Sequence, residues 1–74
     1  MSITVNCFAT LAGYAPQGGS VPHSDGLTVG GLVQALGIPP EQVKTVFVNG
    51  LHAEWDKALA DGDRVGVFPA VAGG

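Results

Sequence analysis

The stretch Thr28-Val-Gly-Gly-Leu-Val-Gln-Ala-Leu-Gly37 carries the clearest helix pattern in this chain of 74 residues. Thr28 is of a type that caps helix N-termini, and the apolar residues after it recur at helical spacing. These apolar residues are Val29, Leu32, Val33 and Leu36. Gly37 fits the position just after a helix, while Gly30 and Gly31 each weaken the helix by roughly 1 kcal/mol relative to alanine. The stretch therefore predicts one amphipathic helix whose apolar stripe needs a surface to pack on.

Strand patterns flank this helix on both sides. Apolar and polar residues alternate over residues 3–9, 45–49 and 64–68, and short returning strands are expected at 20–23 and 51–53. One helix packed on one mixed sheet is the economical way to bury the stripe and one sheet face. We therefore expect an α+β fold of the β-grasp type, the arrangement of ubiquitin-like domains.

The segments between these elements carry turn signals. Asn49-Gly50 is typical of a hairpin turn, and residues 11–19 are rich in glycine and proline, which predicts a loop. Residues 41–44 predict one helical turn or an irregular link. The expected organisation is one domain over residues 1–69, followed by a flexible tail at residues 70–74.

All three phenylalanines fall on one face of the predicted sheet. Valines alternate with Phe47 and Phe68 along their strands, and Phe8 follows the inward-facing Cys7, so the three rings point away from the helix. Contiguous apolar patches on a small protein tend to mark interaction sites. The alternative is a register shift of one residue, which would turn the rings into the core. We predict that the three rings form a docking face.

Composition and charge narrow the possible functions. With 46% hydrophobic and 12% charged residues, a packed core is favoured over disorder, but the chain is too short for a large active-site cleft. A net charge of −3 argues against nucleic acid and acidic membranes as partners. Neither a signal peptide nor a membrane-spanning run is apparent. One cysteine allows no internal disulfide and no iron–sulfur cluster, which excludes ferredoxin-like electron transfer and favours a cytoplasmic location.

The end of the chain predicts the working group. Gly73 and Gly74 have no side chains, so they can pass through a channel too narrow for other residues. An extended segment from Pro69 to Gly74 reaches at most about 20 Å. The Gly74 carboxylate is ionised at neutral pH, with a pKa of about 3.5, and is a poor electrophile. Chemistry at this group therefore requires activation, most simply as an acyl-adenylate, and a frayed tail is the alternative.

The segment Asp61-Gly-Asp-Arg-Val-Gly-Val-Phe-Pro-Ala-Val-Ala-Gly-Gly74 resembles the ending of the small sulfur-carrier proteins. These include the small subunit of molybdopterin synthase and the thiamine-pathway sulfur carrier. The resemblance implies a protein cosubstrate with no catalytic site and no bound cofactor of its own. An ATP-using adenylating enzyme of the ubiquitin-activating type would activate Gly74, a sulfur donor would convert it to a thiocarboxylate, and an acceptor synthase would receive the sulfur.

By position, Phe8, Phe68, Gly73 and Gly74 match this family, and Pro69 and Val71 join the expected partner-binding residues. Ala70 stands where molybdopterin-type endings often have a second proline, and Trp55 slightly favours the thiamine type. Which pathway receives the sulfur therefore stays open. Two other functions also stay open: a ubiquitin-like modifier conjugated through Gly74, and a β-grasp interaction domain with an inert tail.

The remaining candidate residues favour structural roles. Cys7 is expected to be a buried small hydrophobe, and Trp55 a satellite core residue. His23 and His52 lack metal-ligand spacing, so we expect no metal site. Asp61 and Asp63 flank Gly62 in a tight turn, where short acids bind the local backbone.

Overall fold

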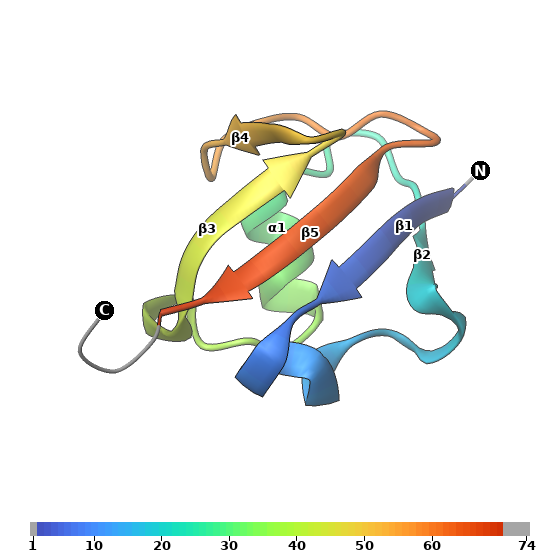
Figure 1. Cartoon of the computed structure of the whole chain (residues 1–74). Coiled ribbons are helices and arrows are strands. Elements are labelled where there is room, and N and C mark those ends of the chain that lie inside the picture. Colours follow the sequence, from blue (N-terminus) through green and yellow to red (C-terminus); the bar gives the residue numbers. More distant parts are fainter. Residues whose placement is uncertain (1, 71–74) are drawn as a thin grey trace.

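The computed structural model describes residues 2–70, in which five strands form one sheet with the helix α1 across one face (Figure 1). The strands are β1 (Ser2–Cys7), β2 (Ser20–Pro22), β3 (Val43–Val48), β4 (Leu51–Ala53) and β5 (Arg64–Pro69), and α1 spans Val29–Ala35. Three 3₁₀ helices complete the set: η1 (Ala9–Tyr14), η2 (Gln17–Gly19) and η3 (Pro40–Gln42). The strands lie in the order β2-β1-β5-β3-β4. The predicted mixed sheet with one main helix is confirmed.

The central pair of strands is parallel. β1 and β5 run side by side in the same direction, whereas β2 pairs antiparallel with β1, and β3 pairs antiparallel with both β5 and β4. The β3–β4 hairpin turns at Asn49 and Gly50, which have positive φ angles of 54° and 82°. Glycine and asparagine tolerate this left-handed conformation, which two-residue hairpin turns require. The hairpin predicted from the Asn-Gly pair is therefore confirmed.

Local contacts explain where α1 begins and ends. The Thr28 side chain accepts a hydrogen bond from the Gly31 N–H at 3.1 Å, which satisfies one of the free donors of the first turn. Gly37 has a φ of 79° just beyond the helix, where a residue with a Cβ would be strained. Both ends agree with the sequence prediction to within one residue.

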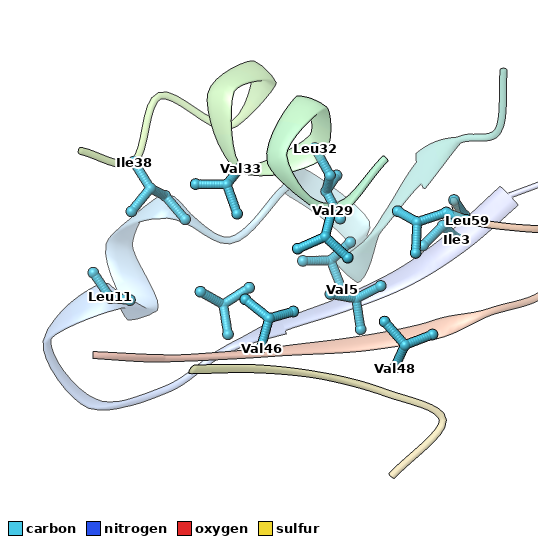
Figure 2. Close-up of a cluster of buried hydrophobic side chains, with 12 residues drawn as sticks. Ile3, Val5, Leu11, Val29, Leu32, Val33, Ile38, Val46, Val48 and Leu59 are labelled. Carbon is cyan, nitrogen blue, oxygen red and sulfur yellow. The ribbon is translucent and has the colours of Figure 1, made fainter. Parts of the chain in front are cut away.

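The core lies between α1 and the sheet (Figure 2). Valines 46 and 48 of β3 and valines 65 and 67 of β5 meet the buried stripe of α1, as alternation predicts. Leu11, Ile38 and Leu59 are also buried, although they lie outside the predicted helix and strands. In Figure 2, Leu11 and Ile38 lie at one end of the core and Leu59 lies beside Ile3 at the other, so they extend the buried layer beyond the stripe of α1.

The prediction of a plain loop at residues 11–19 was wrong. η1 follows β1 directly, and its Leu11 is 0% exposed within the core. The turn begins at Ala9, which has a positive φ of 52°. The chain bends there because one buried leucine offsets the cost of ordering a short 3₁₀ turn. β1 accordingly ends at Cys7, two residues earlier than expected, and β3 begins at Val43, two residues earlier than expected.

Trp55 is not a core residue, contrary to the prediction. It is 44% exposed and follows β4, close to the first turn of α1. The Gly30 N–H donates to the Trp55 carbonyl at 2.8 Å, and a Cβ on Gly30 would lie 3.2 Å from that oxygen. Trp55 Cε3 would lie 3.6 Å from the same Cβ, so both the backbone and one edge of the indole ring lie against Gly30, and the residue stays partly in solvent.

Candidate docking face and carboxyl-terminal exit

Three phenylalanine rings meet on the sheet face opposite α1. Phe8 and Phe68 are stacked, with ring centroids 4.4 Å apart and an interplanar angle of 8°. Phe47 meets Phe68 edge to face at 5.5 Å and 89°. We call these three residues the aromatic cluster. The predicted outward orientation of all three rings is confirmed, and the alternative of rings in the core is wrong.

The strand register brings these rings together. Phe47 of β3 lies opposite Gly66 of β5, and Phe68 lies two residues further along β5 on the same face. Phe8 follows β1, and its N–H donates to the Val67 carbonyl at 3.1 Å, which extends the ladder by one residue. Phe8 is therefore held beside Phe68 although it lies outside the strand. It is 41% exposed, whereas the other two rings are half-buried.

Gly66 is essential to this packing. A Cβ placed on Gly66 would lie 3.3 Å from Phe8 Cε2 and 3.4 Å from Phe68 Cε1, so the two ring edges rest on the glycine backbone. Contacts this short would push the rings outward. The sequence analysis missed Gly66 as a site residue. The signal was present in the alternation, because Gly66 stands between Arg64 and Phe68 on the outward face.

The exit of the chain from the sheet is fixed by its neighbours. Pro69 is paired with Val43, and the Ala70 N–H donates to the Gln42 carbonyl at 2.9 Å. The last described residue is thus tied to η3, directly after the aromatic cluster. Val71, Gly73 and Gly74, which the sequence analysis named as site residues, lie outside the described residues, and their roles stay predictions.

The other candidate residues have local partners. Cys7 is half-buried and packs against the core, and burial raises the pKa of its thiol, which lowers its reactivity. His23 Nε2 lies 3.0 Å from the Leu59 carbonyl, and His52 Nδ1 lies 3.5 Å from a Glu54 carboxylate oxygen. Over residues 2–70 no group of three or more metal-ligating side chains is found.

Asp63 has a structural role at the turn before β5. Its carboxylate accepts hydrogen bonds from the Ala60 N–H at 2.8 Å and from Asn49 Nδ2 at 3.0 Å. The backbone bond from Ala60, followed by the bond from Asn49, lowers the pKa of Asp63. The Asp61 carboxylate accepts a bond from the Ser2 N–H at 2.8 Å. Asp63 thus binds the local backbone as expected, whereas the bond from Ser2 ties Asp61 to the start of β1, 59 residues away in the sequence.

Comparison with known proteins defines the class. The parallel central pair, the antiparallel outer strands and the helix across one face make this chain a ubiquitin-like β-grasp protein. The model of the ThiS family matches residues 5–74, so the chain belongs to the ThiS family. It thus falls among the small sulfur carriers and ubiquitin-like modifiers of β-grasp fold. The resemblance drawn from the last fourteen residues is confirmed at the level of the family.

Solved structures agree with this assignment. SAMP1 from Haloferax volcanii shares 29% identity over 100% of both chains, with a TM-score of 0.73. A putative molybdopterin converting factor, subunit 1, from Pyrococcus furiosus shares 28% identity over 96% of this chain and 99% of that chain, with a TM-score of 0.74. Small archaeal modifier protein 1 of H. volcanii shares 27% identity over 95% and 98%, with a TM-score of 0.72. No curated protein matches the sequence. In the part of the chain that the structure describes, no helix is long and apolar enough to cross a membrane.

Proposed function

We propose that this protein is a sulfur carrier whose working group is the carboxylate of Gly74. A partner enzyme of the ubiquitin-activating type joins this carboxylate to the AMP part of ATP and releases pyrophosphate. A sulfur donor then displaces AMP, which leaves a thiocarboxylate on Gly74. An acceptor synthase takes the sulfur for the biosynthesis of a cofactor of the molybdopterin or thiamine type.

The observation that carries this proposal is the fixed exit of β5. Because the Ala70 N–H is tied to the Gln42 carbonyl at 2.9 Å, residues 71–74 start from a defined point directly after the aromatic cluster. A four-residue extended segment reaches about 13 Å from that point. A partner that binds the aromatic cluster can therefore receive Gly74 in a pocket no more than about 13 Å from Ala70. Family membership supports the same role.

The carrier and its partner enzyme contribute different groups to the reaction. An ionised carboxylate needs activation before a nucleophile can attack it, and the carrier relies on its partner for ATP and for the adenylating groups. The aromatic cluster supplies apolar surface for docking, since buried aromatic rings dominate many interface energies. The carrier itself needs only a rigid docking face and a C-terminal segment that ends in residues without side chains.

The test is to incubate the chain with ATP and candidate adenylating enzymes and to measure the mass of its C-terminal peptide. We expect ATP-dependent adenylation and, with a sulfur donor, a mass gain equal to the exchange of one oxygen for sulfur. Deletion of Gly74 and the change Gly73→Val should abolish both. Gly13→Ala is the matched glycine control, because nothing lies within 4 Å of a Cβ at that position. Full function after deletion of Gly73 and Gly74 would contradict the proposal and favour a plain interaction domain.

A ubiquitin-like modifier is the second candidate, and the likeness to two structures of the small archaeal modifier protein SAMP1 favours it. Both routes begin with adenylation of Gly74, and they differ in the nucleophile, which is a target lysine in the modifier. Intact-mass analysis from cells separates them. Slower-migrating conjugates that require Gly74 would establish modification, and a thiocarboxylate on the free chain would establish sulfur transfer.

A further inference from the structure

Asn49 is held by three hydrogen bonds at the turn between β3 and β4. Its backbone N–H donates to the Arg64 carbonyl at 2.8 Å. Its side-chain Oδ1 accepts from the Arg64 N–H at 3.0 Å, and its Nδ2 donates to Asp63 Oδ1 at 3.0 Å. Both ends of the side-chain amide are therefore fixed to the residues where β5 begins.

The residue after Asn49 makes this amide open to attack from the chain itself. Gly50 has no side chain, so its backbone nitrogen can approach the Cγ of the preceding asparagine with little hindrance. In this reaction the Gly50 nitrogen loses its proton to solvent and bonds to Asn49 Cγ, the Cγ–Nδ2 bond breaks, and ammonia leaves. Water then opens the cyclic imide and leaves aspartate or isoaspartate at position 49. Both residues are exposed, so water reaches them.

The two side-chain hydrogen bonds oppose that attack. The Gly50 nitrogen must approach Cγ from the face of the amide plane, so the amide has to turn away from the orientation that Arg64 and Asp63 fix. The Asp63 carboxylate is itself held, because its other oxygen accepts from the Ala60 N–H at 2.8 Å. The bond from Ala60, followed by the bond from Asn49, lowers the pKa of Asp63. Nδ2 therefore donates to an ionised carboxylate at neutral pH, and such bonds are stronger than neutral ones.

We propose that Asn49 is a site of spontaneous deamidation and that Asp63 holds this site closed in the folded chain. The proposal goes beyond the proposed function and does not depend on it. The Asn49-Gly50 pair supplies the reactive groups, and the turn before β5 supplies the restraint. The chain has one other asparagine, Asn6, which lies within β1 and precedes Cys7, whose side chain hinders the same attack.

The product of this reaction would lose the contact that restrained Asn49. In an aspartate at position 49, an oxygen replaces Nδ2 and faces Asp63 Oδ1, so two carboxylates repel each other where a donor met an acceptor. An isoaspartate also lengthens the main chain within a two-residue turn, whose geometry is specific. Deamidation therefore weakens the β3–β4 turn and the attachment of β3 to β5.

The direct test follows the deamidation of Asn49 at neutral pH by peptide mass, as a gain equal to the exchange of one NH for O. We expect the native chain to react at least about fivefold more slowly than the chain unfolded in urea, and Asp63→Ala to react at least about fivefold faster than the native chain. Val33→Ala is the control for lost stability, because it weakens the buried core on α1 and leaves the turn unchanged.

Three outcomes of this test would overturn the proposal. They are equal rates in the native and the unfolded chain, no reaction in the unfolded chain, and a rate in Asp63→Ala that does not exceed that of Val33→Ala. The first would show that the fold gives no protection, the second that Asn49 is not reactive, and the third that general loss of stability, rather than Asp63, controls the reaction.

An exchange of the two side chains tests the restraint without Asp63→Ala, and it decides where that variant does not fold. Asn49→Asp alone brings two carboxylates together and should lower the urea midpoint at neutral pH. Adding Asp63→Asn restores one donor and one acceptor, so the double variant should have a higher midpoint than Asn49→Asp. A double variant no more stable than Asn49→Asp would show that the Asn49–Asp63 bond does not form, and the proposal would be wrong.

Discussion

Because side chains alternate along β3, the neighbours Val46 and Phe47 lie on opposite faces of the sheet. A charged substitution should therefore destabilise the fold much more at Val46 than at Phe47. Phe47→Asp removes a ring that makes edge-to-face contacts with Phe68 and with His52, together about 1 kcal/mol, and about half the burial of a phenylalanine, about another 1 kcal/mol. Val46→Asp removes a fully buried valine, about 2 kcal/mol, and places a carboxylate in the core, which costs several kcal/mol more. A domain of this size has only about 3–5 kcal/mol of stability. Phe47→Asp should therefore stay folded, and Val46→Asp should unfold.

The assay is a urea titration followed by far-ultraviolet circular dichroism, with the adenylation reaction measured on the folded variant. We expect Phe47→Asp to lower the midpoint by about 1–2 M and to keep the native spectrum, since urea slopes for small domains are about 1–2 kcal/mol per M. Adenylation should be strongly weakened because the docking face has lost a ring. Loss of the native spectrum in Phe47→Asp, or a native midpoint in Val46→Asp, would refute the assignment of faces.

Three further predictions concern positions away from the aromatic cluster. Leu11→Ala should cost about 3 kcal/mol or more, because the side chain is 0% exposed, and a thermal melt showing a small loss would place η1 outside the core. Gly31→Ala should stabilise α1 by up to about 1 kcal/mol, whereas Gly30→Ala should not, because its Cβ meets the Trp55 carbonyl at 3.2 Å; equal melting temperatures would contradict this contact. The lowered pKa of Asp63 gives stabilisation that is complete above its unfolded pKa of about 3.9 and is lost as the pH falls through the folded pKa. Urea midpoints measured from pH 2 to pH 7 should therefore fall less steeply at the acid end in Asp63→Asn, and unchanged acid dependence would show that the Ala60 and Asn49 bonds do not form.

Much of the fold was predictable because it depends on local signals. Thr28 caps the N-terminus of α1, and Gly37 takes the positive φ just after its C-terminus. The Asn49-Gly50 pair favours a two-residue hairpin turn. Strict alternation in β3 and β5 was enough to place the phenylalanines on the outward face. These signals operate within a few residues, so they do not depend on how the sheet is assembled.

What was missed depends on contacts between distant segments. Leu11 belongs to a glycine-rich stretch, and only the open margin beyond β1 makes it a core residue. Trp55 was expected to be a satellite core residue, but it meets α1 only through its backbone carbonyl and one edge of its side chain at Gly30. Gly66 was not singled out from the sequence, although the rings of Phe8 and Phe68 lie on it. The contacts of Trp55 with Gly30 and of Gly66 with Phe8 each join residues more than ten positions apart in the sequence.

Both proposed functions begin with adenylation of Gly74, so a carrier and a modifier would differ in which nucleophile the partner admits to the activated group. A lysine of a target protein is bulky and must approach an acyl-adenylate that is held in the partner's pocket. A sulfur donor is small, or presents only a terminal sulfur, so it can reach Gly74 while the carrier stays docked. A tightly held carrier therefore favours sulfur transfer, whereas a loosely held one can leave for a second enzyme and a larger acceptor. In the proposed function, the aromatic cluster sets the strength of docking. If the protein is a carrier, variants that weaken the aromatic cluster should lower the rate of thiocarboxylate formation by raising the KM for the carrier. If the protein is a modifier, the same variants should lower the rate of conjugation by no more than they lower the rate of adenylation.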